Sequence, residues 1–126
     1  MAQSLESEIE QTELSIEEAK SVIAKGEKAL KLAEDPLFKE LILEGYFEKE
    51  TIRLAHMSSD PNIPAEYREC VNRDLHGPAS LKRYLHTLVQ MSGVAATSLE
   101  EYEETLDEIR EEADGVDVFD ATGSEE

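Results

Sequence analysis

The stretch that decides the fold is residues 5–33, LESEIEQTELSIEEAKSVIAKGEKALKLA. Steps of four and three residues, taken alternately from Leu5, fall on apolar side chains at seven of nine stops. This spacing keeps one narrow apolar stripe on a helix, as in the seam of a coiled coil. Because Pro36 disfavours a helical conformation at Asp35, we expect one helix over residues 3–34. The seam residues of this helix are Leu5, Ile9, Ile16, Ile23 and Leu30.

The same spacing recurs over residues 81–113. Pro78 suits a first helical turn and Gly115 suits a helix end, so we expect a second long helix between them. Gly93 weakens its centre, and a capping-box pattern that begins at Ser98 leaves a break there open. The seam residues of the second helix are Leu81, Leu85, Leu88, Leu99, Tyr102, Leu106 and Ile109.

The two predicted helices can pair with each other as an antiparallel hairpin, or each can pair with another copy of the chain. A lone helix with so narrow a stripe is marginally stable in water. We favour a seam between chains somewhere in the assembly, with a self-contained helical domain as the alternative. The predicted fold class is all-α, with two long coiled-coil-like helices that flank a short compact helical middle, and a flexible acidic tail.

The length of 126 residues allows one domain with a tail but not two full cores. We divide the chain into an N-terminal long helix (1–35), a compact helical middle (36–77), a C-terminal long acidic helix (78–114) and an acidic tail (115–126). Most aromatic side chains lie in the middle segment, which we expect to hold the true core. Its predicted core or partner contacts are Phe38, Ile42, Tyr46 and Tyr67.

Negative charge is concentrated at one end of the sequence. The formal net charge of −18 divides into −5 for residues 1–35, −1 for residues 36–91 and −12 for residues 92–126. A balance of this sign disfavours direct binding to nucleic acids or to anionic membranes. We also expect no membrane span, because no apolar run approaches the roughly 20 residues needed, and no signal peptide at the N-terminus.

The outward positions around the second seam are acidic. This face fits a solvated helix surface, a surface that docks onto a basic protein, or a mimic of a phosphate backbone. The tail beyond it, with Val116, Val118 and Phe119 among acids, fits either plain disorder or a short docking peptide. The acidic face consists of Glu100, Glu101, Glu103, Glu104, Asp107, Glu108, Glu111 and Glu112.

Residue types that carry catalysis are sparse and scattered. The residue three positions before each of His56, His76 and His86 is an arginine, whereas helical di-iron sites place a glutamate there. Cys70 is the single cysteine, which excludes an intramolecular disulfide and fits a reducing compartment. The six glycines are isolated and form no phosphate-binding loop. We therefore expect no enzymatic activity, no cofactor and no metal.

One small basic patch stands out in the C-terminal half. It comprises Lys82 and Arg83, with Tyr84 and His86 beside them. The patch fits either a local ion pair with the acidic segments or an anchor for an acidic partner.

The run DPLFKELILEGYFEKETIRLAHMSSDPNIP (35–64), continued by HGPASLKRYLHTLVQM (76–91), resembles small acidic proteins of tailed bacteriophages encoded near head and packaging genes. The resemblance covers roughly residues 34–91 and has no catalytic signature. It implies a virion or morphogenesis protein, located in the virion or the host cytoplasm, that contacts itself or other phage structural proteins. Scaffolding proteins often bind coat protein through a basic C-terminal helix, whereas this C-terminus is acidic, so that style of scaffold is in doubt. An acidic inhibitor or DNA mimic bound to a basic host nucleic-acid-binding protein is the alternative.

Overall fold

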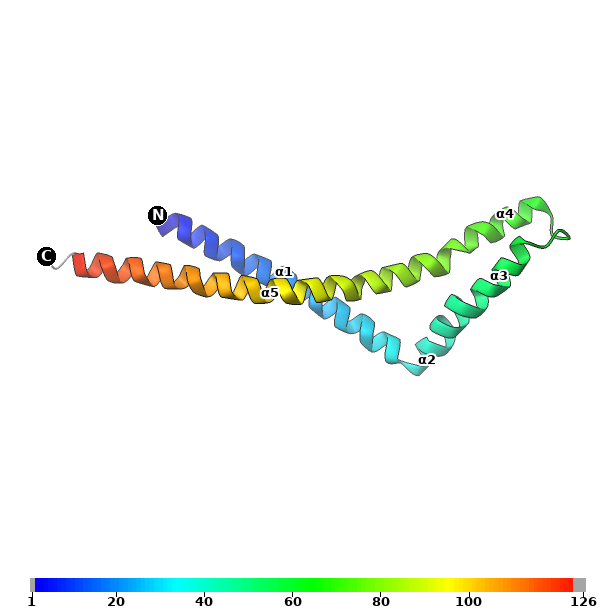
Figure 1. Ribbon diagram of the computed structural model, residues 1–126, viewed down its shortest axis with the longest axis horizontal. Coiled ribbons are helices and arrows are strands. Elements are labelled where there is room, and N and C mark those ends of the chain that lie inside the picture. The colour runs from blue at the N-terminus through cyan, green and yellow to red at the C-terminus, as the bar shows by residue number, and fades with distance from the viewer. Residues whose placement is uncertain (1, 124–126) are drawn as a thin grey trace. The chain divides into compact units, whose positions relative to one another are not determined.

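The computed structural model consists of helices and their connections over the residues that it describes, 2–123, with side-chain surroundings given for residues 4–115 (Figure 1). The predicted all-helical class with two long helices is therefore confirmed. In chain order the elements are α1 (Ala2–Glu34), α2 (Pro36–Phe38), the π-helix η1 (Lys39–Glu50), α3 (Thr51–Ser58), α4 (Ala65–Asp74) and α5 (His76–Gly123).

These helices form two compact units. The first joins α1 up to Ala24 with α5 from Met91 onward, and the second comprises residues 25–90. Both long helices therefore contribute to both units. The four segments predicted from the sequence have other boundaries, and that division stays a prediction.

In the first unit, α1 and α5 lie side by side and run antiparallel (Figure 1). The Arg110 guanidinium donates a hydrogen bond to Glu13 Oε1 at 3.1 Å, which links the two helices on their exposed sides. The helices thus pair within one chain, while a seam between chains and supercoiling stay predictions. The buried side chains of this unit are Ile16, Ala19, Ala95, Leu106 and Ile109.

The end of α1 follows from the Asp35-Pro36 pair. Asp35 has an extended backbone, and its Oδ1 accepts hydrogen bonds from the amides of Leu37 at 2.9 Å and Phe38 at 3.1 Å. An N-cap of this kind satisfies amides that have no partner inside a helix. Asp35 therefore starts the next helix at the point where Pro36 stops α1, and the predicted helix over 3–34 is observed as Ala2–Glu34.

Helix α5 is continuous where a break was open and longer than predicted. Gly93 lies inside it, and the Thr97 hydroxyl donates a hydrogen bond to the Gly93 carbonyl at 3.4 Å. The predicted end at Gly115 is wrong, because the helix continues to Gly123. No described glycine has a positive φ, so Gly115 does not form the left-handed end that this residue favours. The predicted flexible tail is not confirmed, and its last three residues lie outside the described part of the chain.

The second unit contains a π-helix that the sequence pattern did not predict. In η1, hydrogen bonds join residues five apart, which gives a wider turn than the 3.6 residues of an α-helix. A Cβ built on Gly45 would lie 3.1 Å from the Glu40 carbonyl oxygen, five residues earlier in the same helix. The space beside Gly45 is therefore limited by the backbone of its own helix.

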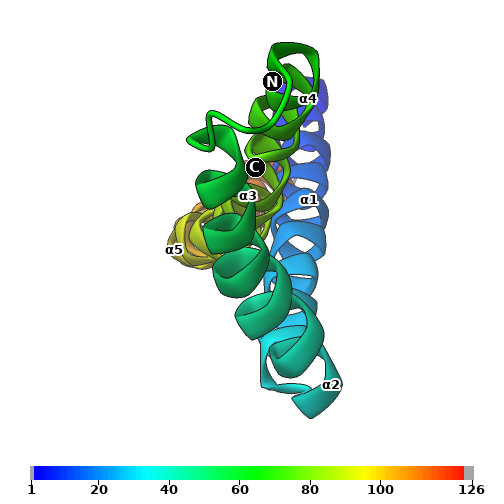
Figure 2. The same ribbon diagram turned by 90° about the vertical axis from the view of Figure 1, so that its right-hand side faces the viewer.

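The chain reverses between α3 and α4 in a short loop at one end of the second unit (Figures 1 and 2). The amide of Asn62 donates to Asp60 Oδ1 at 2.9 Å, and the amide of Ile63 donates to the Asp60 carbonyl at 3.3 Å. The Ser-Ser-Asp-Pro-Asn sequence of residues 58–62 spans the last residue of α3 and this loop. Pro64 comes immediately before α4 and has an extended backbone. Its carbonyl accepts hydrogen bonds from the amides of Tyr67 and Arg68, each at 3.0 Å.

Candidate functional site

The predicted seam residues differ in how far they are covered. Ile16, Leu106 and Ile109 are buried between α1 and α5 in the first unit. Leu30 is the one predicted seam residue that is exposed, with 51% of its surface accessible, and it lies in the second unit. The partly buried seam residues are Leu5, Ile9, Ile23, Leu81, Leu85, Leu88, Leu99 and Tyr102.

All eight residues of the predicted acidic face are exposed. At about 100° per residue they cover roughly half the circumference of α5, opposite the side that packs on α1. Among the side chains that the structure describes, none of the eight forms an ion pair. Because these carboxylates are left to solvent or a partner, this arc of α5 is the most strongly charged surface of the first unit.

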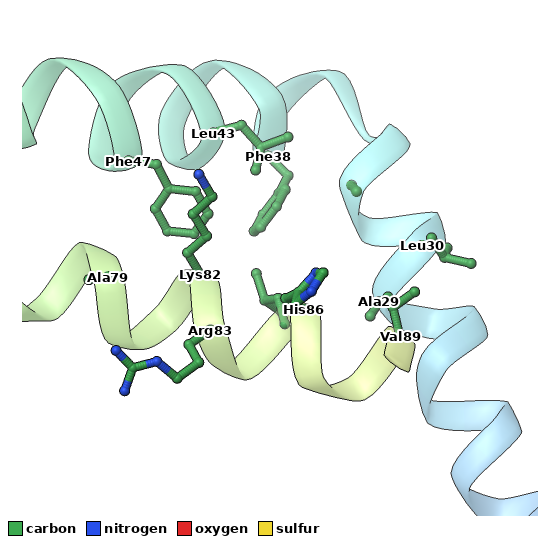
Figure 3. Close-up of a pocket in the computed structure, with 12 residues that line it drawn as sticks. Ala29, Leu30, Phe38, Leu43, Phe47, Ala79, Lys82, Arg83, His86 and Val89 are labelled. Carbon is green, nitrogen blue, oxygen red and sulfur yellow. The ribbon is translucent and has the colours of Figure 1, made fainter. Parts of the chain in front are cut away.

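The second unit holds an open apolar pocket with a volume of about 550 Å³ (Figure 3). Its walls come from the last turns of α1, from the α2–η1 segment and from the first half of α5. This volume falls within the range of about 300–1,000 Å³ that is usual for ligand-binding clefts. The lining residues are Ala29, Leu30, Ala33, Phe38, Leu43, Phe47, Ala79, Lys82, Arg83, Leu85, His86 and Val89.

Basic side chains are the charged groups of this pocket. Lys82 and His86 extend from α5 toward the rings of Phe47 and Phe38, which extend from the opposite wall (Figure 3). The Arg83 guanidinium instead points away from the space between the two walls. Of the described residues that line the pocket, none is acidic. Three residues of the basic patch, Lys82, Arg83 and His86, therefore line one edge of an apolar pocket, with Lys82 and His86 directed into it, whereas Tyr84 lies outside the lining.

Helical geometry decides which aromatic residues line the pocket. The α-helical period predicted contacts by Phe38, Ile42 and Tyr46, whereas the pocket is lined by Phe38, Leu43 and Phe47. Steps of five and four residues fall on one side of a helix with a wide π turn. Leu43 and Phe47 were not predicted as contact residues, because an α-helical period was assumed along the whole segment. The steps of five and four residues from Phe38 to Leu43 and Phe47 were the sequence signal that could have indicated this face.

Tyr46 contacts another part of the second unit. A Cβ built on Gly77, in the first turn of α5, would overlap the Tyr46 hydroxyl group. Glycine at this position therefore lets the tyrosine ring approach the backbone closely. Tyr46 and Ile42 are partly buried, whereas Tyr67 is 57% exposed, which leaves partner contact as its predicted role.

An ion pair spans the junction between η1 and α3. The Arg53 guanidinium donates two hydrogen bonds to the Glu50 carboxylate, one of them from Nε at 3.0 Å, and a third to Met57 Sδ at 3.1 Å. The hydrogen bond from Arg53 is the main cause that lowers the pKa of Glu50, and the same bond raises the pKa of Arg53. Since both side chains are at the surface, the pair contributes little to the stability of the fold.

Residues that could carry chemistry lie apart from one another. His56, His76, His86 and Cys70 are all exposed. Within the described residues, no group of three or more His, Cys, Asp or Glu side chains is placed to hold a metal ion. No described helix combines the length and apolar character needed to cross a membrane.

Comparison with known proteins adds no relative. The sequence matches no protein family, no curated protein and no solved structure at a significant level.

Proposed function

We propose that this chain is a non-enzymatic structural or assembly protein of a bacteriophage that acts through helix–helix contacts. Its partners are further copies of itself or other structural proteins of the particle. The phage setting rests on the sequence resemblance over residues 34–91. The mode of action rests on how apolar side chains are distributed.

The observation that carries the proposal is the imbalance between buried and exposed apolar residues. Among described residues, seven hydrophobic side chains are buried, and two of the seven are alanines. Among those same described residues, ten large hydrophobic side chains are exposed, including Leu37 at 68% and Leu41 at 65%. Because burial of apolar surface is the main favourable term in folding and in association, this distribution favours a chain completed by contact with a partner.

Mass spectrometry of purified particles from a phage that encodes this chain tests the virion role. A component present at many copies per particle supports it. Detection only in lysates before particle maturation supports an assembly role that ends before the particle is complete. Absence from both particles and assembly intermediates contradicts the proposal.

The eight exposed, unpaired carboxylates of α5 favour one alternative, an acidic inhibitor that occupies a basic nucleic-acid-binding protein. The acids come in adjacent pairs, one pair per helical turn, or about one charge per 2.7 Å of helix at a pitch of about 5.4 Å. That density lies between about 1.7 Å per charge for duplex DNA and about 3.4 Å for a single strand.

Dependence on salt separates the two functions. Association through apolar helix faces persists or strengthens in high salt, since burial of apolar surface does not depend on ion pairs. Binding of an acidic mimic to a basic protein weakens steeply as salt rises. Replacement of Glu100, Glu101, Glu103 and Glu104 by glutamine abolishes the mimic's binding and spares helix-mediated assembly.

A further inference from the structure

Two features are left without a role by helix pairing alone. One is the pocket of the second unit with its basic edge. The other is the C-terminal sequence beyond Ala113, in which apolar residues alternate with acids. The pocket has basic and apolar side chains, and the C-terminal sequence has acidic and apolar ones.

The pocket requires an occupant that is both apolar and acidic. Its walls offer the rings of Phe38 and Phe47 for apolar contact, and Lys82 and His86 extend between those walls (Figure 3). An uncharged apolar ligand would displace water from the Lys82 ammonium without replacing its hydrogen bonds. A carboxylate beside an apolar side chain satisfies both parts of the pocket.

The chain contains one stretch of matching composition. Residues 114–120, DGVDVFD, carry three acids and three large apolar residues, and no base follows Arg110 in the sequence. The apolar residues just before this stretch are unavailable to a partner, because Leu106 and Ile109 are buried against α1. Beyond Ile109, the next large apolar residues in the sequence are Val116, Val118 and Phe119, and they stand among acids.

We propose that the pocket of the second unit binds residues 114–120 of a second copy of the chain. The acidic side chains of that segment lie near Lys82 and His86, and its apolar side chains contact Phe38, Leu43 and Phe47. This inference rests on the proposed assembly function and specifies one of its contacts. Because pocket and segment are different surfaces, the contact is heterologous and leads from copy to copy, forming a ring or a chain of subunits.

Complementation between full-length variants tests this contact. Lys82→Glu disables the pocket and leaves the segment intact, whereas Phe119→Ser disables the segment and leaves the pocket intact. In sedimentation velocity, we expect each variant alone to lose the association at least about tenfold, and an equimolar mixture to form a heterodimer. The mixture stops at two copies, because it retains one working pocket and one working segment per pair.

Arg73→Glu is the charge-matched control, since it makes the same charge change on an exposed residue of the second unit that does not line the pocket. We expect it to associate like the natural chain. Equal losses in Lys82→Glu and Arg73→Glu overturn the proposal, because they indicate a general charge effect. A mixture that fails to form the heterodimer overturns it as well.

A labelled peptide of residues 111–123 provides a second readout that does not depend on assembly. It is titrated into the full-length Phe119→Ser variant, whose own segment does not compete. We expect binding that weakens about tenfold when Lys82→Glu is added, and no comparable binding by a scrambled peptide. Equal binding of the scrambled peptide, or binding unaffected by Lys82→Glu, overturns the proposal.

The failure of this contact differs from the failure of the proposed function. If the natural chain associates and both variants associate equally well, the pocket contact is wrong and assembly through another surface stands. If the segment occupies the pocket of its own chain, Phe119→Ser changes the peptide affinity but not the mass of the particle, and the second-copy assignment fails. If the natural chain stays monomeric and binds no peptide, both fail.

Discussion

At the scale of single residues, a few side chains fix where each helix begins and ends. Asp35 caps α2 at the point where Pro36 stops α1. Gly77 admits the Tyr46 ring against the backbone of α5, and Arg53 holds Glu50 across the junction of η1 and α3. The end of α1 at Pro36 was predicted from the sequence, whereas the close approach of Tyr46 to Gly77 was not. The Arg53–Glu50 pair was not predicted either, because no sequence signal marks the change from a π-helix to an α-helix between these two residues.

The Arg53–Glu50 pair predicts a measurable titration. Because the hydrogen bond from Arg53 lowers the pKa of Glu50, the carboxylate should titrate below its ordinary value of 4.5. A pKa lowered on folding gives a stabilising contribution that is present above the unfolded pKa and is lost as pH falls through the folded pKa. We expect Arg53→Gln to return the pKa of Glu50 toward 4.5 and to remove this small acid dependence.

Carbon-detected NMR of the Glu50 carboxyl group across the acid range measures this shift. Lys49→Gln is the control, since it removes an equal charge next to Glu50 without removing the hydrogen bond. A Glu50 pKa that is the same in the natural chain and in Arg53→Gln contradicts the observed pairing.

At the scale of elements, periodicity located the two long helices but not their details. Steps of four and three residues fell on Ile16, Leu106 and Ile109, which are buried, because the heptad spacing follows one side of an α-helix. The same assumption failed over Lys39–Glu50, where π geometry places Leu43 and Phe47 beside Phe38. The helix end predicted at Gly115 was also wrong, and the break left open near Gly93 is absent from α5, since a helix tolerates an interior glycine at a cost of about 1 kcal/mol.

The π-helix predicts different changes in the free energy of unfolding for two glycine substitutions. Gly93 lies in α5 with nothing within 4 Å of a built Cβ, so Gly93→Ala should raise the free energy of unfolding by about 1 kcal/mol. In η1 a Cβ on Gly45 would lie 3.1 Å from the Glu40 carbonyl oxygen, so Gly45→Ala should bring no such gain. Thermal and urea unfolding of both variants measures the difference. An equal gain at Gly45 would indicate an ordinary α-helix there.

The helix pair of the first unit predicts a contrast between two leucines. Leu106 is 8% exposed and Leu14 is 61% exposed. Leu106→Ala should lower the free energy of unfolding by about 2 kcal/mol or more, since it leaves a cavity between α1 and α5. Leu14→Ala should change it by less than about 0.5 kcal/mol. Similar losses from both substitutions, measured by urea unfolding followed by circular dichroism, would show that α1 and α5 pair through another face.

At the scale of the whole molecule, charge and apolar surface have separate locations. The net charge of −12 over residues 92–126 lies mostly on the outward arc of α5, while residues 36–91, which include most of the pocket lining, are nearly neutral. The all-helical class and the acidic C-terminal helix were predictable from the composition and from the spacing of apolar residues. The pocket was not, because its lining residues come from three segments that are brought together only by the fold. A chain with few buried and many exposed large hydrophobic residues is expected to associate.

Light scattering on the purified full-length chain, over a wide range of protein concentrations, tests this expectation most directly. We predict a mass that rises with concentration above the 14.1 kDa of one chain, and that rises equally or further in high salt. A mass that stays at 14.1 kDa up to the highest concentration would contradict assembly through copies of the chain.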